Sequence, residues 1–176
     1  MTKAGDLFAA GEDTQAQATV PAAWAHLPFF TARWPAVAQA LADETRPVQP
    51  APGAMFRALD LCAPGAVRVV ILGQDPYPTA GHADGLAFSV PRGRTLPRSL
   101  ANIYREMEAD LGARPASGDL GPWARQGVLL LNTALSVPVG AADGHRGLGW
   151  SALVAEVLAR RLTPGEAARR LAAAGE

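Results

Sequence analysis

Two short apolar runs, each followed at once by polar residues, constrain the fold of this chain most strongly. The run VRVVIL, from Val67 to Leu72, is rich in β-branched residues and leads directly into GQDPYP. The second run, from Val128 to Leu131, is followed by Asn132. Near-continuous apolar runs of this length predict strands that are buried on both faces of a parallel sheet. Because ligands of open α/β sheets usually bind at the carboxyl ends of the strands, the polar residues after both runs predict a site there.

Helical segments alternate with these strands, which predicts an α/β fold with a central parallel sheet flanked by helices. Between the strands, the segment PRS at residues 97–99 opens an amphipathic helix, which Gly112 ends as a C-cap glycine would. Further helices are expected at about residues 35–44, 55–63 and 150–162, and, after a capping box at 163–166, to about residue 174.

Length and composition limit the classes of protein to which the chain can belong. Its 176 residues fit one domain; we expect residues 1–20, which are small and polar, to form a flexible arm and residues 21–176 to form the domain. With 49% hydrophobic and 18% charged residues, the chain can bury a core and is not globally disordered. No membrane span or export signal is visible, so we expect a cytoplasmic monomer.

Charge and cysteine usage narrow the choice of ligands. The single cysteine, Cys62, cannot form an internal disulfide, and no Cys/His cluster has the spacing of zinc ligands, so neither a metal nor another cofactor is expected. The 16 basic and 16 acidic residues give a formal net charge of zero. Any contact with nucleic acid must therefore be made by a local group of residues.

Three separated segments resemble, in this order and spacing, the family 1 uracil-DNA glycosylases. They are GQDPYPTAGHADGLAFSV at residues 73–90, LPRSLANIY at 96–104 and WARQGVLLLNTALSV at 123–137. The likeness extends over about residues 20–160 and is specific, because several motifs agree. It implies a uracil-DNA glycosylase-like α/β fold and a repair enzyme that flips uracil out of single- or double-stranded DNA and hydrolyses its N-glycosidic bond, leaving an abasic site.

The resemblance assigns five residues to the uracil site. Asp75 matches the catalytic carboxylate, which orients the attacking water and favours the developing oxocarbenium cation. Gln74 matches a residue whose main chain holds uracil O2, and Phe88 matches the ring that stacks on the base. Asn132 matches the amide that donates to uracil O4 and accepts from N3–H, a pattern that cytosine reverses. Tyr77 matches the ring that fills the space of a thymine methyl group.

Three further residues are implied to contact DNA. Pro97 and Ser99 lie in a segment that resembles the loop that holds the DNA backbone through its phosphates. His145 lies where the family has another loop near the DNA.

Taken without the resemblance, the same residues have plainer interpretations. Asp75 precedes a proline after a strand, where aspartate often caps a turn. Phe88 alone is most simply a core residue, and Asn132 alone is a turn or cap residue as readily as a ligand.

The chain also departs from the family in three places. The family often has a histidine where this chain has Pro78, and LPRSL has one proline fewer than the common form of the DNA-holding loop. After the helix that begins at Trp150, family members continue into further strands and a histidine-containing motif, which have no counterpart in ARRLTPGEAARRLAAAGE. We therefore expect the later strands to be missing, the domain to be incomplete, one sheet edge to be exposed and activity to be reduced or lost.

Two alternatives follow from that departure. The chain could be a non-catalytic module that binds uracil-containing DNA, or an inactive remnant. A generic nucleotide-binding α/β protein is disfavoured, because neither a GxGxxG nor a Walker motif is present.

Overall fold

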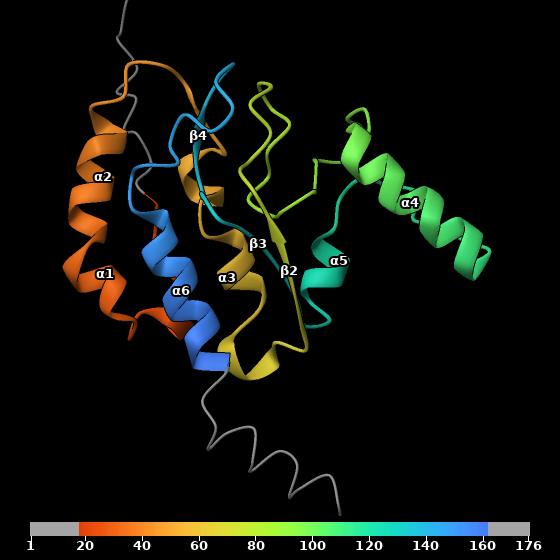
Figure 1. The fold of residues 1–176 in the computed structure, drawn as a ribbon, viewed down its shortest axis with the longest axis horizontal. Coiled ribbons are helices and arrows are strands. Elements are labelled where there is room, and N and C mark those ends of the chain that lie inside the picture. The colour runs from red at the N-terminus through yellow and green to blue at the C-terminus, as the bar shows by residue number, and fades with distance from the viewer. Residues whose placement is uncertain (1–17, 162–176) are drawn as a thin grey trace, which may run out of the picture.

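The computed structural model describes residues 18–161, and its helices lie on both sides of a small central sheet (Figure 1). Helices α1, α2 and α6 lie on one side of the strands, whereas α4 and α5 lie on the other (Figure 1). The helices are α1 (Pro28–Ala32), α2 (Trp34–Ala42), α3 (Arg57–Leu61), α4 (Arg98–Leu111), α5 (Gly121–Ala124) and α6 (Trp150–Arg161), with 3-10 turns at Ala22–Trp24, Pro52–Ala54 and Pro64–Ala66. None of the helices in this part of the chain has the length and apolar composition needed to span a membrane.

The two apolar runs form the parallel pair that the sequence predicts. Strand β2 (Val69–Gly73) pairs with β3 (Val128–Asn132), in a register that places Gly73 opposite Asn132. A second pair, which the sequence analysis missed, joins the two-residue strands β1 (Val48–Gln49) and β4 (Val137–Pro138) in antiparallel orientation. Strands of two residues are too short to show an alternation of apolar and polar residues, and three prolines lie around β1. No sequence pattern therefore predicts these two strands.

The predicted helices are confirmed within the described residues, with bounds shifted by a few positions. Helix α4 ends at Gly112, whose φ of 68° lies in the left-handed region that glycine adopts without cost. Helices α2, α3 and α6 cover the predicted segments, whereas the five-residue α1 was not predicted. The helix expected to about residue 174, and most of the arm expected at residues 1–20, lie outside the described residues.

Aromatic side chains from distant segments form much of the core. Trp150 of α6 stacks on Phe29 of α1 and meets Phe56 edge to face, with centroid separations of 6.0 Å in both pairs. The backbone N–H of Phe29 also donates to Glu156 Oε2 at 2.9 Å, which joins α1 to α6. Trp24, with no exposed surface, donates from Nε1 to two carbonyls near the end of α3. These contacts join α1 to α6 and the 3-10 turn at Ala22–Trp24 to α3, and α3 in turn packs against β3.

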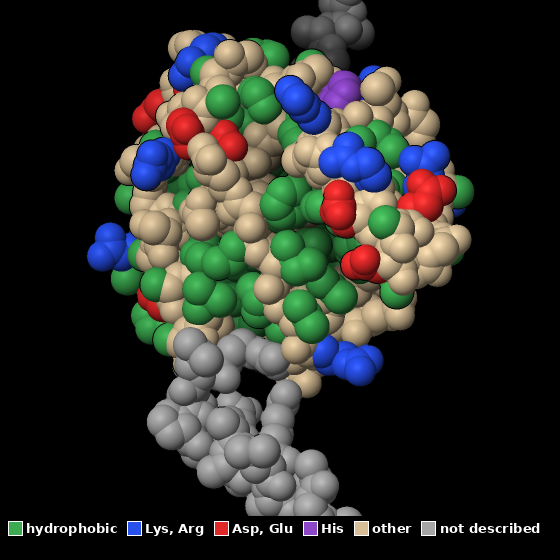
Figure 2. Space-filling view, turned by 45° about the vertical axis from the view of Figure 1, so that its right-hand side comes forward, with side chains coloured by type: hydrophobic (Ala, Val, Ile, Leu, Met, Phe, Trp, Pro, Cys, Tyr) green, Lys and Arg blue, Asp and Glu red, His purple; other side chains and the backbone are tan. Residues whose placement is uncertain are grey.

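The expectation that the first strand is buried on both faces was wrong. Val69 is 51% exposed and Leu72 is 43% exposed, whereas Leu129, Leu130 and Leu131 of β3 are at most 1% exposed. The difference arises because helices α3 and α5 pack against β3, whereas no helix among residues 18–161 packs against β2 to the same extent. Strand β2 also pairs with no strand other than β3 among these residues. Figure 2 shows hydrophobic side chains gathered over the lower part of this face of the molecule. The exposed sheet edge that the sequence predicts is thus present.

Candidate active site

The predicted site is built where β2 and β3 end side by side. Gly73 and Asn132 are register partners at the carboxyl ends of their strands, and Asn132 is only 8% exposed. The Asn132 amide lies so close to the Gly73 backbone that a Cβ there would collide with Asn132 Oδ1 and come within 3.0 Å of the Ala87 methyl group. The absence of a side chain at residue 73 is therefore what allows a buried amide at the end of the neighbouring strand.

Hydrogen bonds hold the residues after the two strands together. The Thr133 N–H donates to Gly73 O at 2.9 Å, and the Ala134 N–H donates to Gln74 O at 3.0 Å. The Thr133 hydroxyl donates to the same Gln74 carbonyl at 2.7 Å. The backbone of Gln74 is thus fixed beside the end of β3, as a main chain that positions a ligand must be.

Asp75 is held in place from a distant segment of the chain. Its Oδ2 accepts the backbone N–H of Asp143 at 2.7 Å, and the Asp143 side chain in turn accepts from Gln74 Nε2 at 2.7 Å. Asp143 has a φ of 61°, a left-handed conformation that aspartate tolerates better than most residues. Asp75 Oδ1 makes no hydrogen bond within residues 18–161. One carboxylate oxygen is therefore anchored, while the other keeps its lone pairs for a water or a cation.

A second cluster brings together Tyr77, Phe88 and Ser99. The Tyr77 hydroxyl donates to the Phe88 carbonyl at 3.1 Å and lies 3.0 Å from Ser99 Oγ, so the serine can donate to it. Burial raises the pKa of Tyr77, and the nearby Asp84 carboxylate raises it further, although the hydrogen bond to Ser99 opposes the shift. Phe88 has a φ of 66°, which is rare for a bulky residue and is typical of a backbone held in place by its surroundings.

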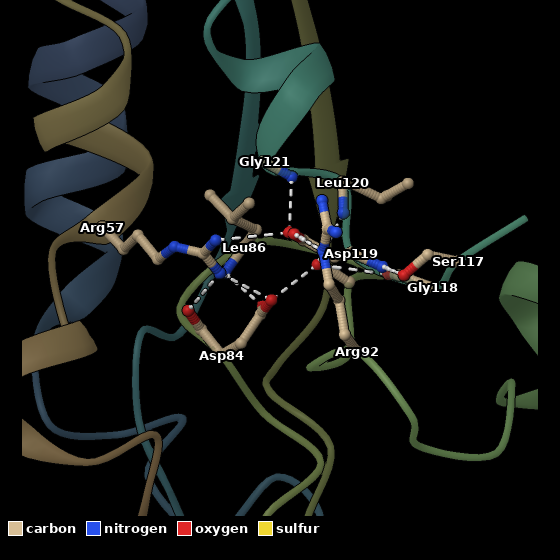
Figure 3. A network of polar contacts seen from close by, with 10 residues as sticks. Arg57, Asp84, Leu86, Arg92, Ser117, Gly118, Asp119, Leu120 and Gly121 are labelled. Atoms are coloured by element: carbon tan, nitrogen blue, oxygen red, sulfur yellow. Dashed lines mark hydrogen bonds and ion pairs between the residues drawn. The ribbon is translucent and has the colours of Figure 1, made fainter. Parts of the chain in front are cut away.

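A polar network that includes Ser89, the residue after Phe88, supplies that support; Figure 3 shows its Arg57, Asp84 and Asp119 side chains. The Asp84 carboxylate, 8% exposed, accepts from Arg57 Nη1 at 2.6 Å and from the Ser89 hydroxyl at 2.7 Å. Arg57 Nη2 reaches Asp119 Oδ1 at 3.3 Å, and the Leu120 N–H donates to Ser89 Oγ at 3.0 Å. The network joins α3, the loop that carries Phe88 and the loop before α5, and so holds the backbone next to Phe88 through Ser89.

The structure places His145 in the interior. Its ring is 4% exposed; Nδ1 lies 2.9 Å from Ser136 Oγ and Nε2 lies 3.4 Å from Glu44 Oε2. The Trp150 indole donates to the same Ser136 hydroxyl at 2.8 Å. Burial lowers the pKa of His145, although Glu44 opposes the shift. A DNA contact by His145 stays a prediction, and its buried ring favours an anchoring role for this residue.

The structure thus brings most of the predicted residues into one region. Gln74, Asp75 and Asn132 lie at the strand ends, and Tyr77, Phe88 and Ser99 lie in the adjoining cluster. Pro97 is the N-cap residue of α4, directly before the turn that carries Ser99. His145 lies apart, packed against Glu44.

Sequence reasoning missed the residues that support the site. Asp143 and the pair Arg57–Asp84 were not singled out, because their roles depend on partners far away in the chain. The one indication in the sequence was that Asp84 is acidic and lies close in the chain to the predicted pocket residue Phe88. Within the described residues, no three His, Cys, Asp or Glu side chains come together as metal ligands would.

Comparison with known proteins gives one consistent result. The model of the Uracil DNA glycosylase superfamily matches residues 59–173. A uracil-DNA glycosylase of Ruegeria sp. (strain TM1040) is 60% identical over 136 residues, which are 77% of this chain and 58% of that protein. The uracil-DNA glycosylase of Bordetella pertussis is 50% identical over 152 residues, which are 80% of this chain and 59% of that protein.

The solved structures agree. The crystal structure of mimivirus uracil-DNA glycosylase superposes with a TM-score of 0.66 at 30% identity, over 74% of this chain and 49% of that one. The fold class predicted from the sequence is thereby confirmed. The chain spans between about half and three fifths of the length of these relatives.

Proposed function

Because this chain belongs to the uracil-DNA glycosylase superfamily, we propose that it removes uracil from DNA by hydrolysing the N-glycosidic bond. Water supplies the oxygen that bonds to C1′ of the deoxyribose, the bond from C1′ to N1 of uracil breaks, and an abasic site remains. The observation that carries the proposal is that Asn132 ends β3 and Asp75 lies two residues beyond the end of the neighbouring parallel strand β2. One supplies a carboxylate for the sugar, and the other supplies an amide for the base.

Recognition of the base follows from the side chains around Asn132. A flipped uracil would stack on Phe88, and a base stacked on an aromatic ring gains about 1–3 kcal/mol. Stacking does not distinguish uracil from other bases, so the choice falls to the Asn132 amide, which can donate to O4 and accept from N3–H. Cytosine would leave that buried amide mispaired. The mismatch should disfavour cytosine relative to uracil by roughly 10⁴-fold or more.

Exclusion of thymine is assigned to Tyr77. The Tyr77 hydroxyl donates to the Phe88 carbonyl and can accept from the Ser99 hydroxyl, and these two hydrogen bonds fix the ring beside Phe88. A fixed ring cannot move aside for the methyl group that distinguishes thymine from uracil.

Catalysis is assigned to Asp75. The Asp143 N–H holds its Oδ2, so the carboxylate is already oriented before the DNA arrives. A fixed negative charge near the sugar stabilises the developing oxocarbenium cation, and it costs no reorganisation at the moment of reaction. Uracil-containing DNA is accordingly the partner that we propose, with the protein acting as a monomer in the cytoplasm.

A second candidate is a module that binds uracil-containing DNA without cleaving it. It would need the residues proposed to hold the base, Tyr77, Phe88 and Asn132, but not the carboxylate of Asp75. Such a module would show uracil-selective binding with no release of the base.

The test compares release of bases from matched oligonucleotides that carry a single uracil, thymine or cytosine. The parent protein should release uracil alone, whereas Tyr77→Ala should release thymine as well, because the blocking ring is gone. Release of uracil without any thymine release by an active Tyr77→Ala protein would contradict the role of Tyr77. Selective binding with no release by the parent would select the non-catalytic module.

A further inference from the structure

Two exposed side chains, those of Thr133 and Asp143, hold Gln74 next to the carboxylate of Asp75. The Thr133 hydroxyl donates to the Gln74 carbonyl at 2.7 Å. The Gln74 side chain donates from Nε2 to Asp143 Oδ1, also at 2.7 Å. Gln74 is therefore held both at its backbone and at its side chain, by two segments that are distant from it in the sequence.

The peptide that joins Gln74 to Asp75 is the first one beyond the paired part of β2, which ends with Gly73 opposite Asn132. On its other side, Pro76 restricts the conformation of Asp75, because a proline disfavours helical angles in the residue before it. The remaining freedom is rotation of the peptide plane between Gln74 and Asp75. Such a rotation would change φ of Asp75 and turn its side chain.

The Thr133 hydroxyl opposes this rotation. It shares the Gln74 carbonyl with the Ala134 N–H, which donates at 3.0 Å, so two donors fix the direction of this carbonyl. Because the peptide is planar, they also fix the direction of the Asp75 N–H. The hydroxyl is the only one of the two donors that a substitution can remove without altering the backbone.

Asp143 holds the same two residues from the loop between β4 and α6. Its backbone N–H donates to Asp75 Oδ2 at 2.7 Å, while its carboxylate accepts from the Gln74 side chain. The carboxylate thus fixes Asp143 against Gln74, which keeps the backbone N–H in position for Asp75. The turn is held further by the Arg146 N–H, which donates to Asp143 O at 3.0 Å.

These contacts lie at the surface, so their effect on folding is small. Gln74, Thr133 and Asp143 are all exposed, and water can replace each partner when one of these hydrogen bonds breaks. The same bonds can still have a large effect on a reaction, because a shift of about 1 Å in a reacting group can cost about 10²-fold in rate. Their effect should therefore be seen in catalysis more than in stability.

We propose that Thr133 and Asp143 are positioning residues for base removal, which fix the direction of the Asp75 carboxylate by holding Gln74; this rests on the function proposed above. Neither side chain contacts the base or the sugar in this account. Both act through Gln74 and Asp75.

The test pairs a disruptive substitution with a conservative one at each position. Thr133→Val keeps the shape of the side chain without the hydroxyl, whereas Thr133→Ser keeps the hydroxyl. Asp143→Gly removes the carboxylate but keeps the backbone N–H and accepts the φ of 61°, whereas Asp143→Asn keeps an oxygen acceptor. The matched control is Thr31→Val, which removes a hydroxyl that donates to the Pro28 carbonyl at 3.1 Å on α1.

Single-turnover release of uracil and binding of a single-uracil oligonucleotide are then measured separately. Thr133→Val and Asp143→Gly should each release uracil about tenfold more slowly, with affinity for the oligonucleotide and melting temperature close to those of the parent. Thr133→Ser and Asp143→Asn should recover most of the rate, and Thr31→Val should match the parent. Parental rates for both disruptive variants would overturn the proposal, as would equal losses for the disruptive and conservative variants.

The double variant Thr133→Val/Asp143→Gly tests whether the two residues act on the same segment. Because both hold Gln74, its loss of rate should be smaller than the product of the two single losses. Losses that multiply would show two independent effects and would contradict a shared action through Gln74.

Nuclear magnetic resonance gives a readout that does not depend on activity. The Asp75 amide nitrogen belongs to the same peptide as the Gln74 carbonyl, so its chemical shift should change when that carbonyl loses a hydrogen bond. Thr133→Val should shift this resonance, and Thr133→Ser should return it toward the parental position. If the parent released no uracil, the proposed function would fail, while this shift would still support the positioning of Asp75 by Thr133. An Asp75 resonance that is the same in the parent and Thr133→Val would overturn it.

Discussion

At the residue scale, two residues outside the proposed reaction determine where the reactive side chains of the site lie. Gly73 leaves room for the Asn132 amide, and Asp143 fixes Asp75 through its backbone N–H. Neither the glycine nor the backbone N–H takes part in the proposed reaction. Both act by determining where an amide and a carboxylate can lie.

Replacing Gly73 by alanine should damage base recognition more than folding. The new methyl group would occupy the position of Asn132 Oδ1, so the amide must move from the place where it reads uracil. We expect Gly73→Ala to lose at least about tenfold in preference for uracil over cytosine oligonucleotides and to lower the free energy of unfolding by about 1–3 kcal/mol. Competition binding and urea unfolding measure the two quantities.

Gly53→Ala is the matched control for that experiment, because nothing lies within 4 Å of a Cβ at Gly53. It should behave like the parent in both measurements. If Gly73→Ala kept the full preference for uracil, the amide of Asn132 would not be the group that reads the base.

At the element scale, the loop between β4 and α6 carries Asp143 to Asp75 and is anchored by His145. The His145 ring contacts Ser136 and Glu44, and the Gly140 N–H donates to Pro78 O at 3.0 Å beside Asp75. This loop therefore joins the helical layer to the candidate active site. The contact that anchors the loop contains two titratable groups, the His145 imidazole and the Glu44 carboxylate.

Acid should loosen this anchor in two steps. Burial holds the pKa of His145 below its ordinary value of 6.5, so the unfolded chain binds the proton more tightly and stability falls as the pH decreases below about 6.5. Hydrogen bonds from Arg46 lower the pKa of Glu44 from 4.5 to about 2, so its contribution is present above pH 4.5 and is lost as the pH falls toward 2. Both groups make the folded chain less stable in acid.

The first step can be assigned by mutation. Between about pH 7.5 and pH 5, the melting temperature of the parent should fall more than that of His145→Gln, which does not titrate in this range. His26→Gln, at an exposed histidine, should keep the parental pH dependence. Identical pH profiles for the parent and His145→Gln would show that another group is responsible.

At the scale of the whole molecule, the strand β2 at the edge of the sheet is apolar and partly open among residues 18–161. Val69 and Leu72 of β2 are about half exposed, and this strand has one paired side among the described residues. Natural proteins usually cover or charge such an edge, because it can pair with another chain.

This edge strand should make the isolated chain self-associate as its concentration rises. Val69→Thr/Leu72→Thr should shift the onset of association to about tenfold higher concentration, since the two side chains bury less apolar area on contact. Light scattering across a dilution series measures the shift. Leu111→Ser, at an apolar residue that is 71% exposed at the end of α4, is the control and should leave the onset unchanged.

The sequence predicted the parts of the fold that local patterns encode. Strand β3, helix α4 with its Gly112 cap and the strand-end position of Asn132 follow from apolar runs and a glycine. The exposure of Val69 did not follow, because burial of a strand depends on neighbours that its own residues do not specify. The site residues came from family motifs, and their supporting contacts, such as that from Asp143 to Asp75, depend on tertiary structure alone.

The most direct test of the central claim is single-turnover release of uracil from a single-uracil oligonucleotide by the parent, Asp75→Asn and Asp110→Asn. Asp110, an exposed carboxylate on α4, is the matched control. We predict that Asp75→Asn binds the oligonucleotide as the parent does but releases uracil at least about 10²-fold more slowly, because the anchored charge beside the sugar is lost. Asp110→Asn should match the parent. Release by Asp75→Asn at the parental rate would contradict the assignment of cleavage to the carboxylate at the end of β2.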